Sequence, residues 1–317
     1  MANRIPVDIP IASLEQHPAV IAWSRITGSS TVPNRITRLN EGHSVVYRLI
    51  GVKGGDSVIA KLCSPQDAEM TRIICTRLLP LVPKPALVFY GSLQASLNDF
   101  WVFLEDAGSL QYSLDDPGHI SAVSAWLAAV HACLAGHVKN LSLPDTGLSR
   151  YLKQLRAGRQ RIVESLSLQE FGAEDGATLR SVVGWFDQVE AQWDKLETLV
   201  SGPHTLVHGD FAPKNILLRQ NAGTLEVFPI DWETAGWGPP APDIGECPDL
   251  VTYRVEALRY GVAWNAETLR GWAAAGKVLR YIAALEWAST FLTRGWPPRG
   301  VRRMKAMLAR IAPALEF

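Results

Sequence analysis

The chain has 317 residues, and its 31 Lys and Arg residues balance its 31 Asp and Glu residues. A formal charge of zero argues against a strongly basic nucleic-acid or membrane binder. With 47% apolar and 20% charged residues, the composition excludes a disordered chain and fits one large domain or two lobes. Four scattered cysteines, the lack of an apolar leader and the lack of a membrane-length apolar run predict a cytoplasmic protein.

The first third of the chain is rich in strand-forming residues. Short β-branched and aromatic runs predict five strands, at residues 34–39, 44–51, 57–62, 86–90 and 100–104. Adjacent glycines in Lys53-Gly54-Gly55-Asp56 are typical of a hairpin turn. A helix is predicted from Ser64-Pro65 to about Leu79, because its apolar residues recur with a helical period.

The remainder of the chain has mainly helical periodicity. Helices are predicted at residues 116–136, 147–168, 175–200, 249–262, 266–293 and 299–314, and strands only within 205–231. We therefore predict an α+β, bilobal protein: an N-terminal lobe at 1–106, with a five-stranded antiparallel sheet and one helix, and a larger, mainly helical lobe at 107–317.

Two segments carry the chemistry, LVHGDFAPKNILL at 206–218 and FPIDWE at 228–233. Asp210 lies in a polar loop, Asn215 leads into an apolar run and Asp231 ends another. Strands that flank a short loop can bring such side chains together. Their oxygen atoms suit a hard cation such as Mg²⁺, which usually takes one or two carboxylates plus phosphates and waters.

The order H-G-D-x-x-x-x-N followed by D-W-E resembles the aminoglycoside phosphotransferase family, the small-molecule branch of the protein-kinase-like fold. The resemblance implies a kinase that uses ATP, or GTP, with Mg²⁺. It implies that Asp210 orients the acceptor hydroxyl and accepts its proton, and that Asn215 and Asp231 hold the metal on the nucleotide. His208 would brace the loop. Lys214 is either a phosphate or substrate contact or a solvated loop lysine.

Glu233 has two interpretations that the sequence leaves open. It either reaches metal-bound water or makes a salt bridge within its loop.

The same resemblance implies nucleotide-binding residues in the first lobe. Lys61, a charge inside the apolar run VIAKL, would contact the phosphates, with Glu69 on the next helix as its ion-pair partner. Further contacts are predicted through the backbone: phosphate at Gly42 and Ser44, and adenine near the hinge residues Glu105 and Ala107.

The acceptor pocket of the family lies between the catalytic loop and the C-terminal helices. We take Trp237, Glu246, Asp249 and Glu286 as candidate acceptor contacts. From residue 241 onward, seven acidic residues stand against eleven basic ones, so a carboxylate-rich wall for a polycation is not favoured. Gly271 to Lys277 fits most of the P-loop spacing, but Val278 replaces the required Ser or Thr, so we interpret it as a helical segment.

The sequence thus predicts a small-molecule kinase that phosphorylates a hydroxyl group, with an antibiotic or other natural product as the leading acceptor. A choline-, homoserine- or sugar-type metabolic kinase is the alternative, and a nucleotide-binding pseudokinase is a further one. A protein kinase is disfavoured because no long activation loop follows Asp231. We expect a monomer or homodimer that binds neither nucleic acid nor membrane.

Overall fold

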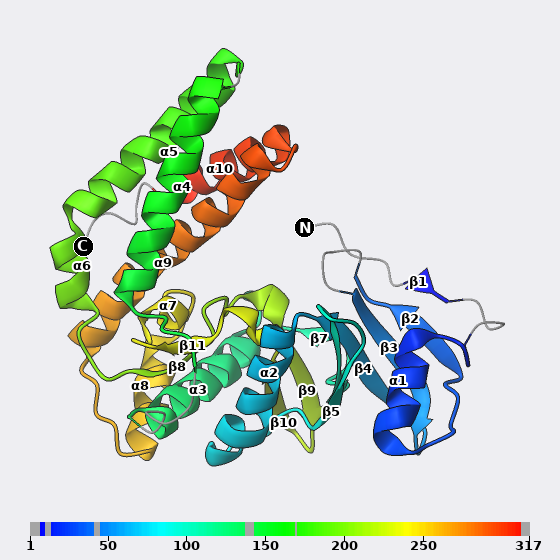
Figure 1. The fold of residues 1–317 in the computed structure, drawn as a ribbon. Coiled ribbons are helices and arrows are strands. Elements are labelled where there is room, and N and C mark those ends of the chain that lie inside the picture. The colour runs from blue at the N-terminus through cyan, green and yellow to red at the C-terminus, as the bar shows by residue number, and fades with distance from the viewer. Residues whose placement is uncertain (1–6, 10–13, 41–44, 137–142, 169, 312–317) are drawn as a thin grey trace. The chain divides into compact units, whose positions relative to one another are not determined.

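The computed structural model describes residues 7–9, 14–40, 45–136, 143–168 and 170–311. The chain divides into two compact units (Figure 1). The first comprises residues 1–113 and 213–233, and the second comprises residues 114–212 and 234–317. Each unit is described below by itself.

The first unit is built on an antiparallel sheet with the strand order β1-β2-β3-β4-β6-β5. The strands are β1 Val7–Asp8, β2 Arg35–Arg38, β3 Val45–Lys53, β4 Asp56–Cys63, β5 Phe89–Gln94 and β6 Phe100–Glu105. Five strands are present as predicted, although the one predicted at 86–90 lies at Phe89–Gln94. The two-residue β1 extends the edge beside β2. Gly54 has φ +59° and Gly55 has φ +100°, backbone angles that fit the predicted hairpin turn between β3 and β4.

Two helices accompany this sheet. α2 (Pro65–Ile73) begins at the predicted place: the Ser64 side chain accepts a hydrogen bond from the Asp67 N–H, and Pro65 occupies the first turn. The helix then widens into a π-helical turn, Ile74–Leu78, and ends in a narrower 3₁₀ turn, Leu79–Leu81.

The sequence analysis predicted no helix at Pro18–Thr27, where the structure has α1. Its Trp23 is buried against Phe103 and Tyr90 of the sheet. This helix is held mainly by apolar contacts with the sheet, and its sequence alone carries a weaker signal.

The hairpin of β9 (Ile216–Asn221) and β10 (Thr224–Pro229) also belongs to the first unit. β9 pairs with β7 (Leu110–Gln111), and Arg219 on β9 lies 2.8 Å from Glu105 of β6. These contacts explain why the unit differs from the predicted lobe at 1–106: it extends to residue 113 and includes 213–233, which come from far along the chain.

The second unit is mainly helical. Its elements are α3 Pro117–Leu134, α4 Leu148–Leu168, α5 Ala173–Ala191, α6 Trp193–Leu199, β8 Thr205–Val207, β11 Gly236–Gly238, α7 Ala241–Ile244, α8 Leu250–Arg259, α9 Ala266–Thr293 and α10 Pro297–Ile311. The predicted helix at 175–200 is interrupted at Gln192, where α5 ends and α6 begins.

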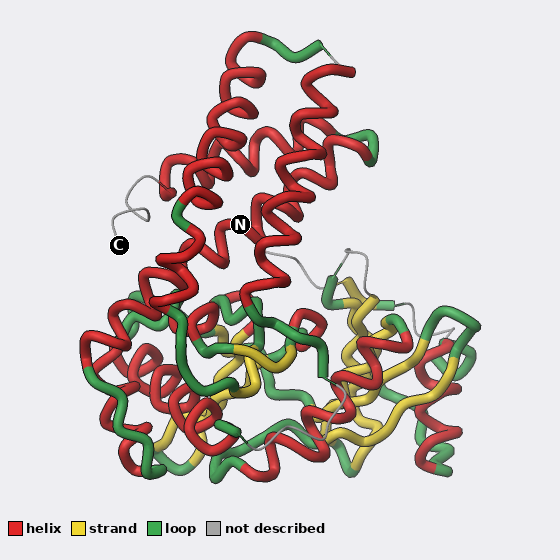
Figure 2. The backbone as a smooth tube through the Cα atoms, turned by 60° about the vertical axis from the view of Figure 1, so that its left-hand side comes forward, coloured by secondary structure: helices red, strands yellow, loops and turns green. Residues whose placement is uncertain are grey.

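Two groups of elements make up this second unit. α4, α5, α9 and α10 pack alongside one another as long helices (Figure 2). In the second group, α3 contacts β8 of the short antiparallel ribbon that β8 and β11 form, and α3 also packs against α8. α6, α7 and α8 each contact α9. Large apolar side chains such as Trp272, Tyr253 and Phe186 are fully buried here. The ribbon positions the loop that follows β8.

Membrane insertion gains no support from the described helices, since none of them combines the length and hydropathy of a membrane-spanning segment. All four cysteines lie in the described part of the chain, and none of them forms a disulfide.

Candidate active site

Asn215 and Asp231 lie at the same end of the β9–β10 hairpin. Asn215 immediately precedes β9, and Asp231 follows β10 by one residue. Because the two strands are antiparallel, with Ile216 opposite Pro229, the start of one meets the end of the other. A backbone hydrogen bond of 2.9 Å from the Ile230 N–H to the Asn215 carbonyl closes this end.

Lys61 is held by two carboxylates from that segment. Its Nζ lies 2.7 Å from Oδ1 of Asp231 and 2.6 Å from Oε1 of Glu233. The lysine is buried in β4. Burial alone would lower the pKa of Lys61, but attraction to Asp231 and Glu233 raises it above its ordinary value. A permanently charged ammonium group therefore lies beside the carboxylate that the sequence assigns to the metal.

The backbone at Asp231 is strained. Its φ is +62°, in the left-handed region that residues other than glycine adopt rarely. Asp tolerates this conformation better than a bulky or β-branched residue does. Such strain persists where surrounding contacts fix it, and it gathers at functional sites. Here the ion pair with Lys61 is one of the contacts that hold the carboxylate in place.

The donor set at this end of the hairpin suits Mg²⁺. Asp231 and Glu233 supply carboxylates whose side chains are 47% and 42% exposed, and the buried Asn215 supplies an amide oxygen. Hard oxygen donors of this kind, few in number and open to solvent, fit a cation that keeps several waters or phosphate oxygens. Asn215 and Asp231 would hold the ion, with Glu233 beside it.

Glu69 differs from its predicted role. It lies exposed on α2 and pairs with Arg72, three residues later on the same helix, at 2.6 Å. Among the described residues, Lys61 pairs with Asp231 and Glu233 instead.

The predicted phosphate contacts Gly42 and Ser44 lie outside the described residues.

The two predicted hinge residues, Glu105 and Ala107, differ in the hydrogen bonds that their backbones make. The Glu105 N–H donates a hydrogen bond of 2.9 Å to the Val88 carbonyl, so this N–H is not available to a ligand. Ala107 is buried beside Leu87 and Phe228, and no hydrogen bond to its backbone is found within the described part of the chain. Base binding near Glu105 and Ala107 stays a prediction.

Asp210 lies in the second unit, in the loop after β8. Gly209 before it has φ +78°, and a Cβ there would lie 2.7 Å from the Thr234 carbonyl oxygen, so this position requires glycine. The His208 ring accepts a hydrogen bond from the Asp210 N–H through Nδ1 at 3.3 Å, and the Thr234 hydroxyl donates to the His208 carbonyl. His208 therefore contacts the loop rather than solvent, and Lys214 beyond it is exposed.

The buried carboxylate of Asp243 holds the loop that carries Asp210. Asp243 on α7 accepts hydrogen bonds from the N–H groups of His208, at 2.7 Å, and Gly209, at 2.9 Å. His131 Nε2 lies 3.5 Å away, and its Nδ1 is 2.8 Å from the Tyr253 hydroxyl. Burial alone would raise the pKa of Asp243, but His131, His208 and the backbone donors lower it, so the carboxylate stays ionised.

Arg280 on α9 is a site residue that the sequence analysis missed. Its Nη2 lies 3.4 Å from Oδ1 of Asp210, and its Nε lies 3.0 Å from Oε1 of Glu246. In the sequence Arg280 is one basic residue among eleven in the C-terminal region, and nothing in its helical period marks it. Only the packing of α9 beside the loop identifies it.

The other acceptor candidates have structural contacts. Asp249 caps α8 by accepting from the Thr252 N–H and hydroxyl, and Glu286 lies 2.9 Å from Arg161 of α4. Trp237 lies in β11, and its ring contacts the His204 ring edge-on. These positions contribute to the fold of the second unit whatever else they contact.

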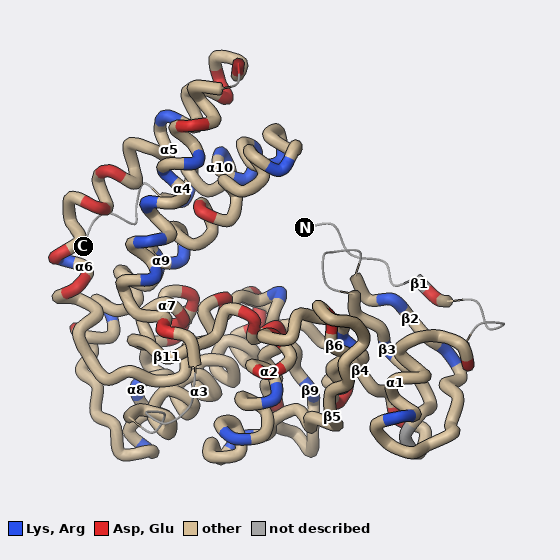
Figure 3. The backbone as a smooth tube through the Cα atoms, viewed as in Figure 1, with Lys and Arg blue, Asp and Glu red and all other residues tan. Residues whose placement is uncertain are grey.

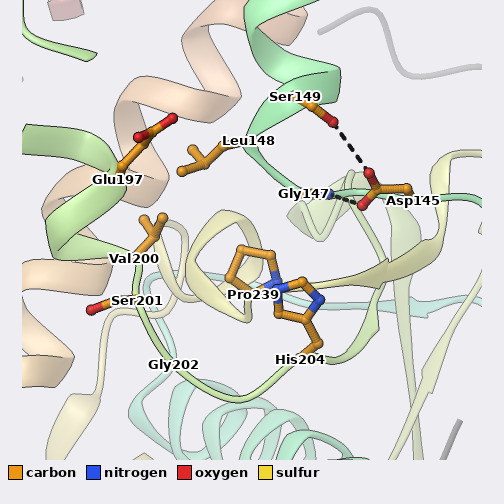
Figure 4. A pocket seen from close by; sticks show the side chains of 10 residues that line it. All are labelled: Asp145, Gly147, Leu148, Ser149, Glu197, Val200, Ser201, Gly202, His204 and Pro239. Carbon is orange, nitrogen blue, oxygen red and sulfur yellow. Dashed lines mark hydrogen bonds between the residues drawn. The ribbon is translucent and has the colours of Figure 1, made fainter. Parts of the chain in front are cut away.

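A separate cavity of about 390 Å³ lies at the start of α4 (Figure 4). None of the residues predicted for the site lines it. It is lined by Asp145, Gly147, Leu148, Ser149, Glu197, Val200, Ser201, Gly202, His204 and Pro239.

Comparison with known proteins identifies the family of this chain. The model of the phosphotransferase enzyme family (APH) matches residues 35–282, which is most of the chain. No curated protein matches the sequence.

Solved structures of similar fold include three small-molecule kinases. Spectinomycin phosphotransferase, solved with ADP and spectinomycin, is 12% identical with a TM-score of 0.61, over 90% of this chain and 94% of that one. Aminoglycoside 2'-phosphotransferase-IIIa, in its GDP complex, is 15% identical with a TM-score of 0.64, over 92% and 97%. A microcompartment-associated aminopropanol kinase is 17% identical with a TM-score of 0.61, over 85% and 89%.

At identities this low, structural similarity establishes only that the fold is shared. The match to the family model establishes that the chain belongs to the family. The family resemblance carried by the motifs is confirmed, and so is the α+β fold predicted from the order of strands and helices. The chain belongs to the phosphotransferase enzyme family and has the protein-kinase-like fold of its small-molecule kinases.

Proposed function

We propose that this protein transfers the γ-phosphoryl group of ATP, or of GTP, to a hydroxyl group of a small molecule in the cytoplasm. An antibiotic or another natural product is the first acceptor class to test, and a metabolic alcohol or sugar is the second. The observation that carries the proposal is the position of Lys61, 2.7 Å from Asp231 at the end of the β9–β10 hairpin where Asn215 also lies.

In this proposal, each residue acts through charge or hydrogen bonding. Lys61 neutralises the nucleotide phosphates, while Asn215 and Asp231 orient the metal-bound nucleotide. Mg²⁺, when bound, neutralises the charge that develops on the phosphate oxygens. Asp210 orients the acceptor hydroxyl and accepts its proton, and His208 and Asp243 keep its loop in place. Positioning and charge supply most of the catalysis, since phosphoryl transfer requires no covalent intermediate on the protein.

The test is a turnover assay with purified protein, Mg²⁺ and either ATP or GTP. The acceptor panel contains antibiotics, choline-like alcohols, amino acids that bear a hydroxyl group, and sugars. We expect nucleotide consumption that depends on one acceptor, together with a product heavier by one phosphoryl group in mass spectrometry. Nucleotide binding without turnover on any acceptor would favour the pseudokinase, and a lack of Mg²⁺-nucleotide binding would contradict the proposal.

Replacement of Lys61 by Met is expected to weaken nucleotide binding by about 10- to 100-fold. The reason is that charge-assisted hydrogen bonds contribute roughly 1.5–3 kcal/mol each. The change in thermal stability should be small, because Asp231 and Glu233 remain about half exposed and can be hydrated. Calorimetric titration with Mg²⁺-nucleotide measures the affinity.

The control for this variant is Lys195→Met, an exposed lysine on α6 in the other unit. We expect it to bind nucleotide as the unmodified protein does. Equal affinities of the Lys61 and Lys195 variants would remove Lys61 from the nucleotide site.

A further inference from the structure

We propose that Arg280 determines the class of acceptor: it keeps ammonium groups away from Asp210, so that the enzyme selects a neutral or carboxylate-bearing hydroxyl compound over a polycation. The inference rests on the proposed function, because it concerns the acceptor whose hydroxyl Asp210 would deprotonate. It narrows the acceptor by its charge, which the preceding proposal leaves open.

The guanidinium of Arg280 lies against the carboxylate of Asp210, the group beside which the acceptor hydroxyl would bind in the proposed function. It is fixed on one side by Asp210, at 3.4 Å, and on the other by Glu246, at 3.0 Å. Its side chain is only 15% exposed, so solvent screens its charge weakly. A second cation brought to Asp210 would meet a like charge and would compete with Arg280 for both carboxylates.

The other acidic side chains of the C-terminal region offer little compensation. Asp243 is buried beneath the loop, Asp249 caps α8, and Glu286 pairs with Arg161. Binding a polycation through any of them would first break a contact that the fold uses. Glu256 pairs with Arg259, and the exposed Glu267 lies in the first turn of α9, about 20 Å along the helix from Arg280. Carboxylates near Arg280 that a polycationic acceptor could pair with are therefore few among the described residues of this region.

Other positive charges near Arg280 also disfavour a polycationic acceptor. Burial and then Glu246 raise the pKa of Tyr281, the residue after Arg280, whereas the positive charges of Arg310 and Arg280 lower it. Arg310 belongs to α10, whose sequence contains Lys and Arg but neither Asp nor Glu, as the blue segments of that helix show (Figure 3). Together these charges favour an acceptor that is neutral or carries an anion near the reacting hydroxyl.

The test compares the binding of kanamycin, a polycation, to the unmodified protein and to Arg280→Gln, by calorimetry with Mg²⁺ and a nonhydrolysable ATP analogue. The variant removes the positive charge and the ion pairs that Arg280 makes with Asp210 and Glu246. We expect the variant to bind kanamycin at least about tenfold more tightly than the unmodified protein. Arg280→Lys, which keeps the charge, should bind it as weakly as the unmodified protein.

Arg161→Gln is the matched control. It removes one positive charge and releases one carboxylate, Glu286, but its partners are Glu286 and Ser289 rather than Asp210. Its affinity for kanamycin should stay within about threefold of the unmodified protein. An equal gain in both Gln variants would mean that net charge alone is responsible, and no gain in Arg280→Gln would overturn the proposal.

Turnover by the unmodified protein gives a second readout that needs no variant. We expect a neutral or carboxylate-bearing acceptor to have the highest kcat/KM in the panel. A higher value for an aminoglycoside would overturn the role of Arg280 and leave the kinase function intact. A lack of turnover on every acceptor would count against the kinase function, while the kanamycin titrations would still decide the role of Arg280.

Discussion

Replacement of Asp210 by Asn is expected to lower kcat for phosphoryl transfer by about 10²- to 10⁴-fold, the range that a positioned general base contributes. The amide has the same shape, so the loop held by His208 and Asp243 should keep its conformation. What is lost is the group that accepts the proton. Steady-state kinetics with the acceptor found in the panel measures the effect, and Mg²⁺-nucleotide affinity should be retained.

The variant Glu246→Gln tests whether Asp210 acts as a general base or only as an ion-pair partner of Arg280. Asp210 and Glu246 both contact that arginine, so both variants weaken its ion pairs. If Asp210 acts as a base, only its own replacement should lower kcat by two or more orders of magnitude. Losses of the same size in both variants would instead make the carboxylate of Asp210 a partner of Arg280 without a direct part in the chemistry.

Replacement of Gly276 by Ala is expected to lower the free energy of unfolding by about 3 kcal/mol. An alanine in the middle of a helix normally gains about 1 kcal/mol over glycine. Here a Cβ would overlap the carbonyl oxygen of Ala241 and lie 3.0 Å from the Gly245 backbone nitrogen, since α7 crosses α9 at this position. Backbone atoms cannot move aside as a flexible side chain can.

Chemical denaturation of the two alanine variants Gly276→Ala and Gly184→Ala checks this expectation. Gly184 lies within α5, and no described atom beyond its own helix lies within 4 Å of the place that a methyl group would take. Its replacement should therefore stabilise the protein by about 0.5–1 kcal/mol. Because α7 carries Asp243, the Gly276 variant should also lose activity. Equal stability of the two variants would show that α7 and α9 are not packed as closely as described.

The sequence alone predicted most of the elements and the motif residues. Helix α9 at 266–293 was predicted with the same bounds, because a long helical period leaves little ambiguity. Helix α1 was missed, since its apolar side chains matter only where the sheet meets them. The segment at Gly271 to Lys277 was predicted to be helical, but the role of Gly276 depends on a neighbouring helix and could not be read from the sequence.

In the candidate site, too, some features follow from the sequence and others only from the tertiary structure. The sequence by itself determined which residues have the chemistry for phosphoryl transfer, because Asp210, Asn215 and Asp231 follow in a fixed order with a fixed loop between the first two. The tertiary structure decided which charges meet. Lys61 pairs with Asp231, 170 residues away, rather than with Glu69, and Arg280 pairs with Asp210. The chain contains many Asp and Glu residues that could pair with Lys61 or Arg280. Coulomb attraction depends on the distance between two charges in space, and the spacing of residues along the chain does not give that distance.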